Sequence, residues 1–417
     1  MAETSEAELE ALLAPRLEAA LASYKESAPP GEVVELMKRL DKAHAQAAAA
    51  SLGEGDGAID EPELAWANTK LGRATRVNEA KPSHVNSEGG LVGFHKYEKL
   101  DIHLLETLIQ YLEHPKKFRS SFVGAREITL PETTSLAIAG DWATGYWQGD
   151  ATAGKRVADR MMQAEYTIHL GDTYYAGRPW ENDRYLGLWP KAQTDNAFAI
   201  RGNHEMYCKG GKPFMKRLPK YFPAQNGVSC FAMSNENWLV LALDTAYFAK
   251  PMFLNGTLGP KRKAQWTFAA DRLKEAKSAN RRVILLTHHA PFNLLRTKHE
   301  DLRHEVHNLF RANRGTDWPD LWAWGHLHNA AVYANAPGEF RGRLIGHGAY
   351  PFGCSSDLAK RQCDGVVLWH ETVNAGDKEP YDLRVTNGFL RIDLNGRDAH
   401  EAIWAELGDE PRWKADF

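Results

Sequence analysis

Apolar residues recur every three or four positions through the first 130 residues, as they do along the buried face of a helix. This spacing predicts helices over residues 3–26, Glu32–Ala50 and Tyr97–Glu113. The first helix ends before Pro29-Pro30-Gly31 and the third stops at His114-Pro115, because proline cannot continue a helix. We therefore expect this part of the chain to form an N-terminal helical extension that packs on the rest of the protein.

From about Thr133 the pattern changes to short β-rich runs that alternate with helical segments. The runs that predict strands are Ser135–Ala139, Tyr166–Leu170, Ala197–Ile200, Trp238–Leu243, Arg282–Thr287 and Leu321–Trp324. The helices predicted between them are near Lys155–Ala164, over Lys261–Lys277 and over Asp301–Asn313. Strands that alternate with helices indicate an α/β fold with a layered sheet.

After Ala330 the helical spacing fades, and the remaining apolar runs predict strands. These are Val366–Trp369, Asp382–Val385 and Phe389–Leu394, with Asn387-Gly388 as a hairpin turn. The chain therefore divides into a helical extension over residues 1–130 and an α/β domain over residues 131–417.

The composition is that of a folded protein with an ordinary core. Of the 417 residues, 43% are hydrophobic and 25% are charged, and the formal net charge is −3. These values exclude a disordered chain, a fibre and a disulfide scaffold, and they argue against a broadly basic nucleic-acid binder. The four cysteines are expected to be reduced. The N-terminus is acidic, without a secretory signal, and no apolar stretch is long enough for a membrane, so we expect a cytoplasmic protein.

Almost every strand predicted in the α/β part runs into potential metal ligands. The motifs that follow these strands are Gly140-Asp141, Gly171-Asp172, Gly202-Asn203-His204-Glu205, His288-His289 and Gly325-His326-Leu327-His328. Sites in open α/β sheets form outside the carboxyl ends of strands, so these side chains can converge on one point. A single Asp or His at a strand end is usually structural, but five such ends in one chain favour a site.

Carboxylates, an amide oxygen and imidazoles together suit Fe, Mn or Zn rather than Ca²⁺. The candidate groups outnumber the four ligands of one tetrahedral ion, so two metals are the natural count. Two neighbouring ions can clamp a phosphoryl group and turn a bridging water into hydroxide. Asp172, in the middle of the set, is the best candidate for the carboxylate that bridges them.

The order of these motifs resembles that of the calcineurin-like metallophosphoesterases, over about Thr133 to Leu407. That family has two Gly-Asp motifs, then Gly-Asn-His followed by Asp or Glu, then a His after a strand, then Gly-His-x-His. The resemblance implies a metallophosphoesterase-type β-sandwich core flanked by helices. It also implies a hydrolase that cleaves a small phosphorylated substrate by attack of a metal-bridging hydroxide.

Two positions resemble the purple acid phosphatase branch of this family. Many members have a His two residues after the first Asp, where this chain has Ala143. The purple branch lacks that His and has a Tyr three residues after the second Asp, where this chain has Tyr175. The resemblance implies a phosphomonoesterase in which Fe, bound by the Tyr175 phenolate, is paired with Zn, Mn or a second Fe. Tyr174 would point to the opposite side if this stretch is extended.

Carried over residue by residue, the resemblance assigns a role to each candidate. One metal takes Asp141, Asp172, Tyr175 and His328, and the other takes Asp172, Asn203, His288 and His326. His204 is not a ligand in this pattern, and it either acts as general acid at the leaving oxygen or contacts phosphate. Glu205 is expected to fix the tautomer of His204.

Several features stay open at the level of the sequence. His289 either supports the metal ligands or packs in the core, and His347 either contacts substrate or packs. Residues 52–63 echo a calcium-binding EF-hand loop, but Leu52 stands where the first carboxylate is needed, so we interpret them as a turn. Two other functions are a cyclic-nucleotide or other phosphodiesterase and a non-catalytic scaffold with the same fold. The intact ligand set argues against the scaffold.

Overall fold

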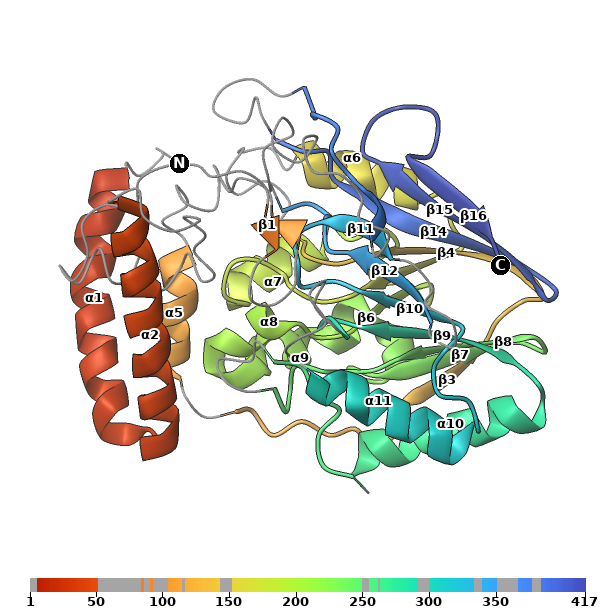
Figure 1. Cartoon of the computed structure of the whole chain (residues 1–417), viewed down its shortest axis with the longest axis horizontal. Coiled ribbons are helices and arrows are strands. Elements are labelled where there is room, and N and C mark those ends of the chain that lie inside the picture. Colours follow the sequence, from red (N-terminus) through yellow and green to blue (C-terminus); the bar gives the residue numbers. More distant parts are fainter. Residues whose placement is uncertain are drawn as a thin grey trace.

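The computed structural model describes residues 6–51, 84–85, 91–92, 104–114, 117–142, 152–249, 255–261, 263–291, 300–333, 340–350, 367–376 and 384–417. Two β-sheets pack face to face with helices on their outer faces, and three helices from the N-terminal part stand to one side (Figure 1). The predicted α/β sandwich flanked by helices is confirmed.

The six-stranded sheet has the order β16-β15-β14-β4-β5-β6. Its parallel half consists of β4 (Thr133–Ala139), β5 (Tyr166–His169) and β6 (Ala197–Ala199). Its antiparallel half consists of β14 (Gly388–Asn395), β15 (Asp398–Ala405) and β16 (Trp413–Asp416). Because β14 pairs with β4, the last part of the chain completes the sheet that the first strand of the α/β region begins.

The eight-stranded sheet has the order β13-β11-β12-β10-β9-β8-β7-β3. Its parallel centre consists of β8 (Trp238–Ala242), β9 (Arg282–Thr287), β10 (Leu321–Trp324) and β12 (Arg341–Ile345). Its flanks consist of β13 (Val367–His370) and β11 (Ala330–Tyr333) on one side, and β7 (Phe231–Ser234) and β3 (Arg126–Thr129) on the other. A separate small pair joins β1 (His84–Val85) and β2 (Leu91–Val92). β3 precedes residue 131, so strand pairing begins before the predicted domain boundary.

The main core lies between the two sheets. Ile138 and Ile168 of the six-stranded sheet pack in one cluster with Val240 and Ile284 of the eight-stranded sheet. Helices cover the outer faces: α10 (Ala264–Ser278) and α11 (Glu300–Asn313) on the eight-stranded sheet, and α6 (Thr152–Met161), α7 (Pro179–Leu186) and α9 (Lys212–Tyr221) on the six-stranded sheet. Strands buried on both faces in this way read as continuous apolar runs in the sequence.

The N-terminal helices bury their apolar faces against the α/β part. They are α1 (Glu6–Ser27), α2 (Pro30–Ser51) and α5 (Leu104–Glu113). Their cluster of buried leucines continues into Met206 and Tyr207 of α8 (Asn203–Tyr207). The extension therefore packs directly behind the helix that begins at Asn203.

Each strand and helix predicted before Ala330 is present, with ends that differ by a few residues. Parts of several predicted elements lie outside the described residues: residues 3–5 of the first helix, residues 97–103 of the third helix, Val366 of one strand and residues 382–383 of another. The predicted hairpin turn at Asn387-Gly388 is wrong, because Gly388 begins β14. The turn falls instead at Asn395-Gly396, where β14 meets β15 and Gly396 has a φ of 58°.

Candidate metal centre

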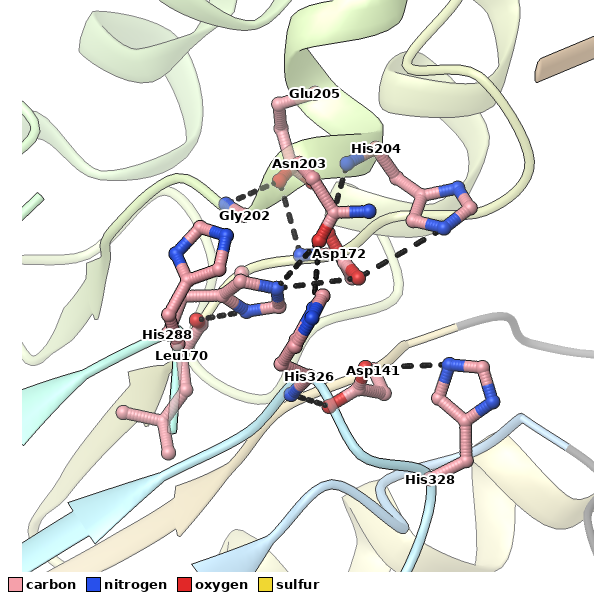
Figure 2. A network of polar contacts seen from close by, with 12 residues as sticks. Asp141, Leu170, Asp172, Gly202, Asn203, His204, Glu205, His288, His326 and His328 are labelled. Carbon is pink, nitrogen blue, oxygen red and sulfur yellow. Dashed lines mark hydrogen bonds and ion pairs between the residues drawn. The ribbon is translucent and has the colours of Figure 1, made fainter. Parts of the chain in front are cut away.

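The carboxyl ends of five strands meet at one end of the sandwich. β4, β5 and β6 come from one sheet, and β9 and β10 come from the other. Figure 2 shows six of the predicted ligands around one point: Asp141, Asp172, Asn203, His288, His326 and His328. The two-sheet arrangement therefore gathers ligands that are almost 190 residues apart along the chain.

Asn203 lies between two imidazoles. Its Oδ1 is 2.9 Å from Nε2 of His288 and 2.8 Å from Nδ1 of His326. Nε2 of His288 is also 3.2 Å from Oδ2 of Asp172. The ligand atoms of Asp141, Asp172 and His288 all lie within 4.8 Å of one another, and Oδ1 of Asp141 is 3.6 Å from Nε2 of His328. Ligand atoms this close to one another can share a metal ion.

The backbone is left-handed at three of these positions. The φ angles are 61° at Asp141, 66° at Asp172 and 71° at His326, a region that residues with a side chain rarely adopt. Such conformations are strained and cluster at functional sites. Hydrogen bonds hold them in place: the His326 N–H donates to Oδ2 of Asp141 at 2.9 Å, and the His204 N–H donates to Oδ1 of Asp172 at 2.8 Å.

Two glycines allow the ligand loops to touch. A Cβ at Gly202 would lie 2.1 Å from Oδ1 of Asp172 and 2.6 Å from Cε1 of His288, and one at Gly325 would lie 2.7 Å from Oδ2 of Asp141. All three distances are shorter than the 3.0 Å that real Cβ atoms keep. A side chain at either position would therefore displace the neighbouring ligand loop or its carboxylate.

Burial dominates the electrostatics of the site. It raises the pKa of Asp141 well above the usual range, and the Asp172 carboxylate adds to the rise. Burial also acts to raise the pKa of Asp172, but the nearby imidazoles, led by that of His288, outweigh it and lower this pKa overall. Burial lowers the pKa of His288, so that imidazole is neutral at neutral pH.

These groups fit a metal centre. A cation would neutralise two adjacent buried carboxylates, which are otherwise costly to bury together. It would also engage Oδ1 of Asp141, a buried atom that accepts no hydrogen bond. A neutral imidazole such as that of His288 is the form that binds metal. The donors, which are oxygen and nitrogen without thiolate, suit Fe, Mn or Zn.

The His204 ring lies beside the ligands and is oriented by a backbone carbonyl. Its Nδ1 donates to the carbonyl oxygen of Tyr175, because a carbonyl can only accept. Its Nε2 lies 3.9 Å from Oδ2 of Asp172 (Figure 2). Burial lowers the pKa of His204 to about 4. The tautomer of His204 is therefore set by the backbone at residue 175.

The prediction that Glu205 fixes this tautomer is wrong. The Glu205 carboxylate accepts three backbone N–H groups instead: those of Gly202 at 2.7 Å, Asp172 at 2.9 Å and Thr173 at 2.5 Å. Burial raises the pKa of Glu205 to about 7. Glu205 caps the start of α8 and ties the loop after β5 to the loop after β6.

The prediction that Tyr174 points away from the site is also wrong. Its hydroxyl lies 3.5 Å from Oδ2 of Asp172 and is hydrogen-bonded to Nε2 of His328. The extended alternation assumed for this stretch does not hold, because residues 174–176 form a turn. The ring of Tyr175 is buried edge-on against Tyr174, with centroids 6.1 Å apart. The role of Tyr175 as a ligand stays a prediction, and Ala143 lies outside the described residues.

Sequence reasoning also missed Tyr350. Its ring stacks on that of Tyr174 with centroids 4.2 Å apart and lies 4.7 Å from the ring of His328. Its N–H donates to the Asp141 carbonyl at 3.2 Å. The available signal was its position shortly after β12. The neighbouring strands β9 and β10 of the parallel centre are also followed by site residues, His288 and His326.

The two histidines left open by the sequence lie in different places. The ring of His289 is 4.8 Å from that of His326, and its Nδ1 is 2.8 Å from the hydroxyl of Thr245. His289 therefore borders the ligands. The His347 ring lies against Gly388 of β14, and both of its nitrogens are buried without a hydrogen bond. Burial lowers the pKa of His347 to about 3. Residues 52–63, with the EF-hand-like pattern, lie outside the described residues.

Residues 134–330 match the family described as calcineurin-like phosphoesterase. They form a calcineurin-like phosphoesterase domain. This domain carries every ligand of the candidate centre, from Asp141 to His328. The candidate centre therefore lies in a domain of the metallophosphoesterase type, a family that uses two metals to hydrolyse phosphate esters.

Several solved structures are similar to the chain at low sequence identity. They include GAP50, the anchor in the inner membrane complex of Plasmodium, at 13% identity, 68% of this chain, 88% of that chain and a TM-score of 0.45. They also include a dimetal phosphatase from Danio rerio, at 12% identity, 68% of this chain, 98% of that chain and a TM-score of 0.43. The curated proteins contain no match to this chain.

Among the helices within the described residues, none is both long enough and apolar enough to cross a bilayer.

Proposed function

We propose that the domain is a phosphomonoesterase with two metal ions bound at the strand ends. The observation that carries the proposal is the position of Asp172, which lies 3.2 Å from Nε2 of His288 and within the same compact set as Asp141. A carboxylate in that position can serve two ions at once. One ion would be held by Asp141, Asp172 and His328, and the other by Asp172, Asn203, His288 and His326.

Bound ions would supply a nucleophile from water at neutral pH and neutralise charge on the phosphoryl group. The chain supplies the proton for the leaving oxygen. The candidate donor is His204 in its imidazolium form, because Nδ1 keeps its proton on the Tyr175 carbonyl and the proton on Nε2, on the side of Asp172, can then be transferred. His204→Ala should keep both metals and lose roughly 10²–10⁴-fold in kcat. The loss should be largest for poor leaving groups, and equal losses for good and poor ones would mean that His204 only binds phosphate.

We further propose that one of the two metals is iron bound by a tyrosine phenolate, as in the purple acid phosphatase type of site. A phenolate on ferric iron absorbs visible light, and a nearby cation favours the phenolate form. We favour Tyr174 as the phenol, because its hydroxyl is the one found beside Asp172 and His328. Iron-loaded Tyr174→Phe should then lose its colour while Tyr175→Phe keeps it. The opposite result would assign the ligand to Tyr175, and a colourless iron-loaded wild type would exclude both.

Metal analysis coupled to a panel of phosphate esters tests the function as a whole. Wild type should bind two metals and hydrolyse monoesters faster than diesters. Asp172→Asn should lose metal and nearly all turnover, whereas Asp183→Asn, at a half-exposed carboxylate on α7, should lose neither. A preference for diesters would favour the phosphodiesterase. A metal-loaded wild type without any turnover would favour the scaffold.

A further inference from the structure

Helix α5 of the N-terminal extension lies against the segment that orients His204. Figure 1 shows α5 between the α1–α2 pair and the α7–α8 region. Leu108 and Ile109 are buried in one cluster with Met206, and the ring of Tyr111 meets that of Tyr207 edge-on at 6.4 Å. The extension lies outside the residues that match the phosphoesterase family.

Thr107 of α5 reaches the carbonyl that holds the His204 ring. The Thr107 side chain is buried, and its Oγ1 donates to the carbonyl oxygen of Tyr175 at 3.2 Å. Nδ1 of His204 donates to the same oxygen. A carbonyl oxygen has two lone pairs, so one acceptor joins a hydroxyl of the extension to the imidazole of the site.

Glu106, the residue before Thr107, secures the other side of the same segment. Its buried carboxylate pairs with Arg16 of α1 at 2.8 Å and with Arg178 at 3.1 Å. Arg178 in turn pairs with Glu181 at 2.7 Å. Glu181 accepts the N–H of Tyr175 at 3.0 Å. The N–H and the C=O of residue 175 are therefore both connected to α5.

We propose that α5 positions His204 for proton transfer, with Thr107 and Glu106 as positioning residues. Without the Thr107 hydroxyl, the Tyr175 carbonyl loses a donor and can rotate together with the imidazole. Catalytic groups must be held to within roughly 0.5 Å and 10–20°, and a misplacement of about 1 Å can lower the rate about 100-fold. This inference rests on the proposed function of His204.

The test uses the full chain loaded with metal and compares Thr107→Val with Thr107→Ser. Valine keeps the shape of threonine and loses the hydroxyl, whereas serine keeps the hydroxyl. For an alkyl phosphate, whose leaving group needs a proton, kcat of Thr107→Val should fall about 10-fold with KM unchanged. For p-nitrophenyl phosphate, a good leaving group, kcat should change less than about two-fold. Thr107→Ser should restore most of the alkyl phosphate activity.

A matched pair on the same helix separates positioning from general stabilisation. Glu106 and Glu113 both pair with Arg16. Glu106 also pairs with Arg178 and so connects to the segment around Tyr175, a connection that is not seen for Glu113 among the described residues. Glu106→Gln should therefore repeat the leaving-group-dependent loss, and Glu113→Gln should leave kcat unchanged. Equal losses for both substrates, or wild-type kcat in both Thr107→Val and Glu106→Gln, would overturn the proposal.

A measurement without turnover distinguishes this inference from the proposed function. In protein with ¹⁵N-labelled histidine, the Nδ1 proton of His204 should be protected from solvent exchange in the wild type and in Thr107→Ser. It should exchange several-fold faster in Thr107→Val. If no phosphate ester is hydrolysed by the wild type, the proposed function fails, and the exchange rates still decide whether α5 holds the ring. Equal exchange rates in the wild type and Thr107→Val would refute the inference.

Discussion

Replacing Gly202 by alanine places one methyl group between two ligand loops. The backbone of Gly202 has φ −103° and ψ −171°, which any residue can adopt. The effect of Gly202→Ala is therefore purely steric. The new Cβ would lie 2.1 Å from Oδ1 of Asp172 and 2.7 Å from its backbone N, so a side-chain rotation alone cannot relieve the contact.

The size of the effect follows from these distances. The Asp172 carboxylate must retreat by about 0.9 Å before Cβ reaches the 3.0 Å that real contacts keep. The 2.8 Å hydrogen bond from the His204 N–H to the same oxygen is then lost. Overpacking of this kind costs about 1–3 kcal/mol of stability. Metal–ligand distances tolerate only about 0.2 Å, so metal binding should suffer more than folding.

Urea unfolding, metal analysis and turnover together test this reasoning. Gly202→Ala should remain folded, bind fewer than two metals per chain and lose at least ~100-fold in turnover. Gly31→Ala is the matched control, because a Cβ at Gly31 in α2 would meet nothing within 4 Å. It should retain metal and activity, with stability unchanged or slightly raised. A Gly202→Ala protein with two metals and wild-type turnover would refute the close approach described for this site.

Three other outcomes are expected from the structure. Asp244→Ala should cost about 3–5 kcal/mol in urea unfolding, because it leaves the fully buried Arg201 guanidinium without its carboxylate; a loss below 1 kcal/mol would contradict this. The hydrogen bond from Arg217 lowers the pKa of Asp183, so the stability from this pair is present above the unfolded-state pKa of about 4 and is lost as pH falls through the folded-state pKa. Asp183→Asn should remove that pH dependence and lower the free energy of unfolding by less than about 1 kcal/mol, since the pair is partly exposed. An unchanged acid-unfolding curve would count against the pair. Chelation should lower the melting temperature, and added metal should restore it, because only the folded chain gathers the ligands; equal melting temperatures would argue against a bound metal.

Much of the fold could be predicted because the strands of the parallel centres are buried on both faces. The runs Arg282–Thr287, apolar at residues 283–286, and Leu321–Trp324, apolar throughout, are found as β9 and β10 with the predicted ends. Two of the strands that were missed, β15 and β16, lie in the antiparallel half of the six-stranded sheet, where one face is partly exposed and the apolar run is interrupted. Whether Asn387-Gly388 or Asn395-Gly396 forms the hairpin turn depends on the pairing of β14 with β4 and β15. The local sequence pattern does not encode that pairing.

The sequence by itself determined which residues can bind metal and that they meet. Asp141, Asp172, Asn203, His288 and the two histidines after β10 each follow a strand, and parallel strands bring their carboxyl ends to one edge. Only the tertiary structure decided how the other groups of the site are used. The partner of His204 is a carbonyl on another loop, and Tyr174 points inward where residues 174–176 form a turn and not an extended strand. Thr107 reaches the site from a helix 68 residues away from Tyr175 in the chain. Such contacts depend on orientations between distant segments, which the spacing of residues along one segment does not encode.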